Sequence, residues 1–368
     1  MDDSDISLGP VLVTGGCGFI GFHLVTGILK VEPDCAIHVV DVNTTRNRID
    51  GVTYHTADIS SQSDAERVFN AAKPKTVFHL ACPDSMVQQP AVFHRVNVVG
   101  ACNLVNAARK TAHAFVNTTS SSVIHDNVSD LRNADESFPV LKYPAQKRVY
   151  SLTKAEADEI IKAANRDGGD NAASMLTVEL RPATVFGPRD TVCMGKIVAN
   201  ARAGKANIQM GPGNNYYDFV YVSNYVDANI LAAKALLKAY GKPPPADDMR
   251  VDGEAFNVTN DEPVEFWEFQ RGIAASVGLP ARKEDIKIIP VWMALLVALF
   301  SEWSTWIRTF GKGQPIVTRE AVRLTTITRT MNCDKIKRVL GYRPKLSMEE
   351  GLAIAGKWFR EDEHKSKD

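Results

Sequence analysis

The sequence predicts an α/β fold in which a doubly wound parallel sheet carries helices on both faces. Through residues 1–185, short strand-like runs alternate with helical stretches, and this alternation is typical of parallel sheets. The runs VLVTG and VFHLA are almost continuously apolar, as expected for strands that are buried on both faces. The predicted fold class is therefore a Rossmann-type doubly wound parallel sheet with a smaller, discontinuous, mostly helical C-terminal substrate lobe.

The elements of the sheet follow one another along the chain without long gaps. Strands are predicted in PVLVTGG (10–16), AIHVVDV (36–42), VTYHTADI (52–59), TVFHLAC (76–82), AFVNTTS (114–120) and LTVELRP (176–182). Helices are predicted between them, over residues 19–30, 61–72, 96–110 and 151–165, where apolar residues recur at helical spacing.

After Pro188 the alternation of predicted strands and helices becomes less regular. Residues 218–237 indicate a strand and then a helix, FNVTN (256–260) a returning strand, and 332–359 two short helices around a turn. These patterns predict a nucleotide-binding domain over 1–188 with 218–262 returning to it, a substrate-binding lobe over 189–217 and 263–345, and a C-terminal helix and tail over 346–368. In doubly wound sheets, ligands bind at the carboxyl ends of the strands, so the lobe is expected to cover that edge.

Composition and charge exclude several classes of protein. The 368 residues include 43 Lys and Arg against 43 Asp and Glu, with no basic cluster, so no nucleic-acid partner is expected. The 6 cysteines are scattered without metal-ligand spacing, which predicts no metal site and reduced thiols in a cytosolic setting. The acidic, polar start MDDSDISLGP resembles neither a signal peptide nor a transit peptide, so secretion is not expected.

The segment TGGCGFIG (14–21) follows the first strand and opens the first helix. Its glycines Gly15, Gly18 and Gly21 allow a tight turn, close approach of backbone N–H groups to a pyrophosphate, and close helix–strand packing. The context therefore predicts a dinucleotide-binding loop.

Carboxylates at the ends of the next two strands indicate which dinucleotide is bound. Asp41 ends the second strand, where a carboxylate accepts from the ribose hydroxyls of NAD and repels the 2′-phosphate of NADP. Arg46 and Arg48 lie nearby, so NADP remains the less favoured alternative. Asp58 ends the third strand and either faces the adenine or caps the helix that begins in SSQSDAE.

The stretch YPAQKRVYSLTKAEAD (143–158) contains the pattern Y-x-x-x-K twice. On a helix, a tyrosine and a lysine four residues apart share a face and converge, so the ammonium lowers the pKa of the phenol. Tyr143 precedes a proline, which disfavours helix at that position, whereas Tyr150 begins a run of helix formers. The predicted acid–base pair is therefore Tyr150 with Lys154, and Tyr143 is expected in the preceding loop.

The spacing of these parts resembles the extended branch of the short-chain dehydrogenase/reductase superfamily, from Val11 to about Tyr342. The matching motifs are TGGCGFIG, HLA (79–81), Asn97 in NVVGACNLV, TTSSS (118–122), YSLTK (150–154) and RPATVFGP (181–188). The resemblance implies an α/β enzyme that oxidises an alcohol with NAD, in which a hydroxyl from the TTSSS run holds the substrate oxygen.

The same resemblance implies roles for individual residues. It places the catalytic serine at Ser120, with Ser121 and Ser122 as alternatives. The resemblance implies that Asn97 supports the helix that carries Tyr150 and a proton-relay water. Without the resemblance, an asparagine at this position is equally consistent with a helix N-cap. The remaining residues implied to contact the cofactor are Phe19, Ile20, Ile59, Leu80, Ala81, Pro182, Ala183 and Thr184.

The substrate is indicated by Tyr217, which precedes DFVYV (218–222). Nucleotide-sugar epimerases and dehydratases usually carry an arginine there, and without it a bidentate phosphate contact is missing. The stretches GPGNNYYDFVYVSNYVDA (211–228) and KRVLGYRPKLSMEEGL (337–352) instead resemble the 3β-hydroxysteroid dehydrogenase group.

Within that group, the resemblance implies oxidation of the 3β-hydroxyl of a sterol 4α-carboxylate with loss of CO₂, in sterol biosynthesis. Oxidation of another triterpenoid or meroterpenoid alcohol without decarboxylation is the alternative. A nucleotide-sugar epimerase is less favoured, and so is a non-catalytic dinucleotide sensor, because both Tyr150 and Lys154 are present.

One apolar segment departs from the mixed polar and apolar pattern that is expected of a soluble protein. Ile288 to Phe300 reads IIPVWMALLVALF, which is shorter than the roughly 20 residues of a membrane-spanning helix. Either it lines an apolar cavity as a buried helix, or residues 288–310 contact a membrane surface with their tryptophans. The expected location is the cytoplasmic face of the endoplasmic reticulum membrane or the cytosol, with a homodimer as a further expectation.

Overall fold

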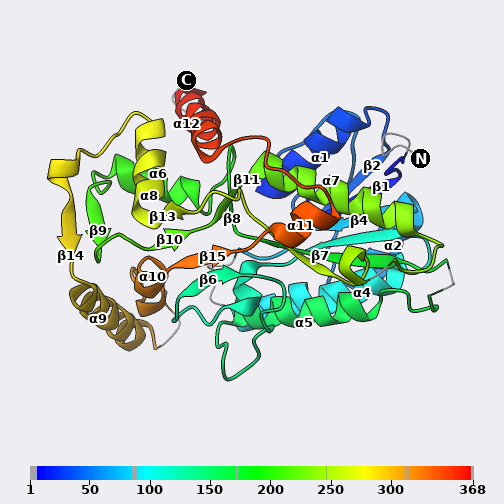
Figure 1. Cartoon of the computed structure of the whole chain (residues 1–368), viewed down its shortest axis with the longest axis horizontal. Helices are drawn as coiled ribbons and strands as arrows, with labels where there is room; N and C mark the ends of the chain where they lie inside the picture. The colour runs from blue at the N-terminus through cyan, green and yellow to red at the C-terminus, as the bar shows by residue number, and fades with distance from the viewer. Residues whose placement is uncertain are drawn as a thin grey trace.

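The computed structural model of the chain describes residues 6–84, 89–170, 173–245, 247–310, 313 and 315–365. Its centre is a seven-stranded sheet in which neighbouring strands are parallel, in the order β12-β7-β5-β4-β1-β2-β3 (Figure 1). The predicted doubly wound sheet is thereby confirmed. The strands are β1 (Val11–Thr14), β2 (Ile37–Asp41), β3 (Thr53–Thr56), β4 (Thr76–His79), β5 (Ala114–Thr118), β7 (Leu176–Pro182) and β12 (Ala255–Val258).

Helices cover both faces of this sheet. Figure 1 shows α1 (Phe19–Val31) and α7 (Val222–Ala239) on one face, and α2 (Gln62–Ala72), α4 (Gly100–Ala108) and α5 (Val149–Ala163) on the other. Alternate residues of a strand point to opposite faces, so Val11 and Val13 join the apolar core under α1 and α7, whereas Leu12 joins the core under the other helices. Both faces of the central strands are buried, which explains the continuous apolar runs in their sequences.

The helices differ from the sequence prediction at three places. The helical segment predicted over 96–110 begins earlier, at Pro90, and runs through α3 (Pro90–Phe93), the π-helix η2 (His94–Val99) and α4 in succession. Helix α5 begins at Val149 rather than at residue 151, so it includes Tyr150. The last helix, α12 (Met348–Lys365), is 18 residues long and not short as predicted.

The second part of the molecule contains short strands, of which only β11, followed by α7, was predicted, from the strand and helix pattern of residues 218–237. A four-stranded sheet has the order β13-β10-β15-β6, and two further pairs are β8 with β11 and β9 with β14. These strands have only two to four residues, too few for a recognisable period. They are β6 (Leu131–Ala134), β8 (Thr184–Phe186), β9 (Ile208–Met210), β10 (Tyr216–Tyr217), β11 (Phe219–Tyr221), β13 (Val264–Glu265), β14 (Lys287–Ile289) and β15 (Arg329–Met331).

Five further helices between residues 194 and 339 complete this part, and the longest of them, with 19 residues, exposes large apolar side chains. They are α6 (Met194–Arg202), α8 (Phe266–Ser276), α9 (Val291–Thr309), α10 (Arg319–Leu324) and α11 (Asp334–Val339). In α9 the buried residues are the small Ala294 and Ala298, while large apolar side chains face outward. The interpretation of this segment as a buried helix is therefore wrong. Within the described residues, no helix combines the length and apolarity that a membrane crossing requires.

Candidate active site

A cavity of about 920 Å³ lies at the carboxyl ends of the parallel strands. It opens where the strand order reverses between β1 and β4, the position at which doubly wound sheets bind ligands. The cavity brings together all the predicted site residues except Asn97: Gly15, Gly18, Phe19, Ile20, Gly21, Asp41, Asp58, Ile59, Leu80, Ala81, Ser120, Tyr150, Lys154, Pro182, Ala183 and Thr184.

The glycine loop forms one end of the cavity. Gly15 has a φ of 70°, and a Cβ built on it would lie 2.8 Å from the Cα of Ala81. A Cβ on Gly21 would lie 2.3 Å from the carbonyl oxygen of Gly15, so a side chain would separate α1 from the strand. Gly18 is the N-cap of α1 and supplies no side-chain cap. The first backbone N–H groups of the helix are therefore available to an anion such as a pyrophosphate.

Asp41 lies beside this loop, where a dinucleotide's ribose would be held. Its carboxylate accepts from the backbone N–H of Cys17 at 3.2 Å and from that of Asn43 at 3.2 Å. These contacts orient the carboxylate and leave acceptor capacity for ribose hydroxyls. The residues present at this end therefore fit NAD.

The two neighbouring arginines are placed differently. Arg48 lies with its guanidinium carbon 4.2 Å from the centre of the Tyr54 ring and donates to the Thr44 carbonyl at 3.1 Å. Arg46 lines the cavity. Of the two, Arg46 is thus the arginine available to a 2′-phosphate.

Asp58 lines the cavity without capping a helix. Its carboxylate accepts from the backbone N–H of Ser60 at 2.9 Å and from the Ser60 hydroxyl at 2.7 Å. The N-cap of α2 is Ser61, which accepts from the backbone N–H of Asp64 at 3.3 Å. The capping alternative for Asp58 is therefore wrong, and its carboxylate instead shapes the loop at the cavity wall.

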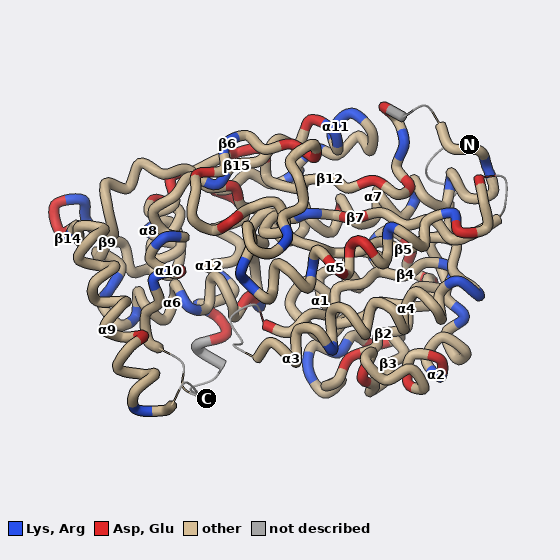
Figure 2. Tube along the Cα trace, turned by 90° about the horizontal axis from the view of Figure 1, so that it is seen from below, with Lys and Arg blue, Asp and Glu red and all other residues tan. Residues whose placement is uncertain are grey.

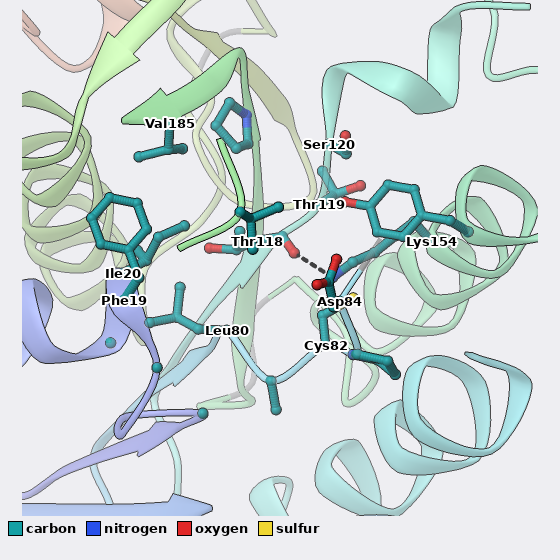
Figure 3. A pocket seen from close by; sticks show the side chains of 18 of the residues that line it. Phe19, Ile20, Leu80, Cys82, Asp84, Thr118, Thr119, Ser120, Lys154 and Val185 are labelled. Carbon is teal, nitrogen blue, oxygen red and sulfur yellow. Dashed lines mark hydrogen bonds between the residues drawn. The ribbon is translucent and has the colours of Figure 1, made fainter. Parts of the chain in front are cut away.

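Tyr150 and Lys154 lie one turn apart on α5 and both line the cavity. The Lys154 side chain is only 4% exposed, and its amine donates to the Thr118 carbonyl oxygen at the end of β5 at 2.8 Å (Figure 3). The Tyr150 ring packs edge-on against Phe93, with 5.9 Å between ring centres. Tyr143, in contrast, is 75% exposed in the loop before α5, as predicted.

The surroundings of the Tyr150 phenol act on its pKa in opposite directions. Burial is the largest influence and raises the pKa above its ordinary value, whereas the Lys154 ammonium and a hydrogen bond with Ser120 lower it. The balance is a raised pKa, so the phenol is protonated near neutral pH. Further positive charge close to the ring is needed before Tyr150 can act as a base at that pH.

The three candidate serines make different contacts. Ser120 lies beside the Tyr150 phenol and lowers its pKa, and its oxygen accepts from the backbone N–H of Ser122 at 3.1 Å. The hydroxyl of Ser122 is buried and donates to Ser120 at 2.9 Å. Ser121 is buried and accepts from Arg329 at 2.9 Å. The geometry therefore favours Ser120 as the serine that meets a substrate oxygen beside Tyr150.

Asn97 lies behind the cavity wall, in the middle of the π-helix. Its amide donates to the Thr153 hydroxyl of α5 at 3.0 Å, and Thr153 in turn donates to the Val149 carbonyl at 2.9 Å. Its buried Oδ1 has no partner among the described residues. The N-cap alternative is wrong because helical backbone continues on both sides, and the amide instead contacts the helix that carries Tyr150.

Sequence reasoning did not identify the arginines at the far end of the cavity. Arg329, on β15, lines it beside Tyr217, its register partner on β10. The Tyr217 hydroxyl donates to the Leu324 carbonyl. Arg148 also lines the cavity, 5.2 Å from the centre of the Tyr150 ring. No local motif marks these arginines, because strand pairing and the start of α5 bring them to the site.

Comparisons with known proteins agree with this arrangement. The model of the 3-beta hydroxysteroid dehydrogenase/isomerase family matches residues 12–288. The chain is 32% identical to the sterol-4-alpha-carboxylate 3-dehydrogenase ERG26, decarboxylating, of Saccharomyces cerevisiae, over 96% of this chain and 99% of that protein. It is 31% identical to the sterol-4-alpha-carboxylate 3-dehydrogenase, decarboxylating, of Mus musculus, over 92% of this chain and 88% of that protein.

Solved structures show the same fold at greater sequence distance. The UDP-glucose 4-epimerase of Thermus thermophilus, crystallised with NAD, superimposes with a TM-score of 0.69 at 22% identity, covering 95% of this chain and 98% of that one. A dTDP-glucose 4,6-dehydratase of Bacillus anthracis, also crystallised with NAD, gives a TM-score of 0.67 at 20% identity, covering 96% and 97%. At this level of identity the likeness concerns the fold.

Replacing Asp41 by serine should shift the binding preference from NADH toward NADPH by about tenfold or more. The change removes a like charge from the place of the 2′-phosphate and keeps Arg46 in the cavity. Fluorescence titration with each reduced dinucleotide gives the ratio of dissociation constants. Asp50→Asn, at an exposed carboxylate away from the cavity, is the matched control. An unchanged ratio in the Asp41→Ser variant would show that Asp41 does not face the ribose.

Proposed function

The chain belongs to the 3-beta hydroxysteroid dehydrogenase/isomerase family, and we propose that it oxidises the 3β-hydroxyl of a sterol 4α-carboxylate to the 3-ketone, with NAD as oxidant and with loss of CO₂. The observation that carries the proposal is the convergence of Tyr150, Lys154 and Ser120 at one end of a dinucleotide-sized cavity. The relatives named for this reaction match nearly the whole chain, which supports the substrate class.

The oxidation step follows from the placement of these side chains. Ser120 and Tyr150 hold the substrate hydroxyl between them, and Tyr150 accepts its proton. Bound NAD⁺ supplies the hydride acceptor and a positive ring charge. The Lys154 ammonium, fixed on the Thr118 carbonyl, lowers the pKa of Tyr150 against the effect of burial. Because the phenolate is the reactive form, oxidation should accelerate as the pH rises toward the pKa of Tyr150.

Loss of CO₂ then needs little further machinery. The ketone lies beside the carboxylated carbon, so the oxidised substrate is a β-keto acid, and the electron pair of the C4–carboxyl bond passes into an enolate as CO₂ leaves. Ser120 and protonated Tyr150 donate to the enolate oxygen, which they already held as the alcohol. The same two side chains, Ser120 and Tyr150, therefore serve both the oxidation and the decarboxylation.

The epimerase alternative is less well supported. At the position where epimerases usually place a pyrophosphate-binding arginine, this chain has Tyr217, whose hydroxyl is engaged by the Leu324 carbonyl. Phe266 and Leu324 line the cavity nearby. An apolar wall of this kind suits a sterol body better than a nucleotide sugar.

The two Y-x-x-x-K copies provide a matched pair of variants for testing the reaction. Tyr150→Phe should lower the rate of NADH formation from a 4α-carboxysterol by about 10²-fold or more, because it removes the proton acceptor. Tyr143→Phe, at the exposed copy, should leave the rate within about twofold. Absorbance of NADH measures both. Equal rates for wild type and Tyr150→Phe would exclude the assigned base.

We further propose that α9 attaches the protein to a membrane surface, on the cytoplasmic face of the endoplasmic reticulum. Trp292, Phe300 and Trp303 of this helix are 64%, 72% and 62% exposed, an arrangement typical of interfacial helices. Figure 1 places α9 at one end of the molecule, beside α10, whose last residue Leu324 lines the cavity together with the following Thr325. Glu302, one of two charged residues of α9, pairs with Arg319 of α10 at 2.7 Å. A sterol dissolved in lipid would thus enter close to the attached face.

Co-sedimentation with phosphatidylcholine vesicles tests this attachment. The triple variant Val297→Gln, Phe300→Gln, Trp303→Gln should lose most of the bound fraction, because the exposed apolar side chains supply the binding energy. Val31→Gln with Val128→Gln, two exposed valines outside α9, is the control and should bind as wild type does. A wild-type protein that ignores vesicles but forms a dimer lost in the triple variant would show that a second copy covers this face instead.

A further inference from the structure

Two hydrogen bonds link three segments that surround the start of α1. Arg189, in the loop after β8, donates to the side-chain oxygen of Asn47 at 2.7 Å. Asn47, in the loop after β2, donates in turn to the backbone carbonyl of Cys17 in the glycine loop at 2.9 Å. These contacts, called the Arg189–Asn47–Cys17 link below, connect the second part of the molecule to the loop that forms one end of the cavity.

The link lies behind the cavity wall. Neither Asn47 nor Arg189 lines the cavity, whereas their chain neighbours Arg46 and Asp190 do, and so does Cys17. A substitution at Asn47 or Arg189 would therefore shift two parts of the wall without removing a side chain that faces a ligand in the cavity.

The backbone at both ends of the Arg189–Asn47 bond has an uncommon conformation. The angle φ is 71° at Arg189 and 50° at Asn47, in the left-handed region that residues other than glycine rarely adopt. Asparagine tolerates this region through local hydrogen bonds of its short side chain, which arginine does not have. Such a conformation persists only where the surroundings fix it. The contacts of the Arg189 side chain therefore help to determine the path of its loop.

Two helices also hold Arg189 in place. Its guanidinium carbon lies 4.1 Å from the centre of the Phe22 ring of α1 and 5.9 Å from that of the Trp358 ring of α12. The carbonyl oxygen of the preceding Pro188 accepts from the His23 ring of α1 at 2.9 Å. A guanidinium can stack on aromatic rings while it donates hydrogen bonds in its own plane. One side chain thereby connects α12, α1 and the loop after β2.

We propose that Arg189 is a positioning residue that holds the loop after β2 against the glycine loop and so slows release of the dinucleotide; this inference rests on the NAD-dependent part of the proposed function. The start of α1 and the end of β2 fit the pyrophosphate and the ribose, and the link fixes the chain beside both. Release of an enclosed ligand requires the surrounding loops to open. Opening of the loop after β2 requires the Arg189–Asn47 bond to break, so this bond adds to the barrier for release.

Release of NADH from the full-length protein, followed by stopped-flow fluorescence, tests this assignment. Arg189→Met keeps an unbranched side chain between the two aromatic rings but has no donor, and it should release NADH about tenfold faster than wild type. Asn47→Ala should have the same effect, and the double variant should exceed neither single variant, because all three break one link. Arg189→Lys, which keeps a charged donor, should lie between wild type and Arg189→Met. Arg338→Met, at an exposed arginine of α11 outside the cavity, is the control and should release NADH as wild type does.

A second measurement distinguishes positioning from a general loss of structure. The Kd of NADH, obtained by fluorescence titration, should rise about tenfold in Arg189→Met, because most changes of affinity within one site lie in the dissociation rate. At saturating NAD⁺, kcat/KM for a 4α-carboxysterol should stay within about twofold of wild type, since Arg189 lies outside the cavity that holds the reacting groups.

The outcomes separate the inference from the function beneath it. Unchanged NADH release in both Arg189→Met and Asn47→Ala overturns the inference alone. Effects that multiply in the double variant also overturn it, because the two residues then act separately, and so does an equal loss of kcat/KM for the sterol. If Arg189→Met does not fold, the release rate of Asn47→Ala decides in the same way. A wild type that binds NADH and oxidises no 3β-hydroxysterol overturns the proposed function while the release rates still decide the inference, and one that binds no NADH overturns both.

Discussion

The hydrogen bond from the Lys154 amine to the Thr118 carbonyl joins helix α5 to the end of strand β5, and the rest of the site depends on it. The Thr118 hydroxyl is in turn bonded to Tyr225 of α7, at 2.7 Å, on the opposite face of the sheet. Both helix layers are therefore fixed to the strand end from which the serine loop departs. Tyr150 lies one helical turn before Lys154, so this contact also sets the distance between the phenol and Ser120.

The reaction end of the cavity carries several cations, of which Arg148 pairs with Glu320 at 3.3 Å. The uncapped start of α1 lies at one end of the cavity and Lys154 at the other (Figure 3). Figure 2 shows Lys and Arg interspersed with Asp and Glu along the tube. The pyrophosphate of a bound dinucleotide is an anion that suits the start of α1. Burial raises the pKa of Tyr150 and lowers that of Arg329, so the protonation of both side chains depends on the charges that lie close to them.

The sequence allowed prediction of features that depend on neighbouring residues, and it failed where distant segments meet. The seven-stranded sheet, the glycine loop and the choice of Tyr150 over Tyr143 follow from local periodicity, glycine spacing and a proline. The N-cap alternative for Asn97 failed because a π-helix continues through that position. Arg329 was not identified because it reaches the cavity through pairing of β10 with β15, two strands too short to show a pattern. The choice among three serines required the contacts made by each hydroxyl.

The most direct test of the account follows both chemical steps at once in the complete protein. A 4α-carboxysterol labelled with ¹³C at the carboxyl group is incubated with NAD⁺, and NADH absorbance and released ¹³CO₂ are recorded together. The account predicts equal amounts of NADH and ¹³CO₂, with NADH never appearing later than the gas. NADH without labelled CO₂ would contradict the decarboxylating reaction, and the absence of NADH with this and every other 3β-hydroxysterol would contradict the account as a whole.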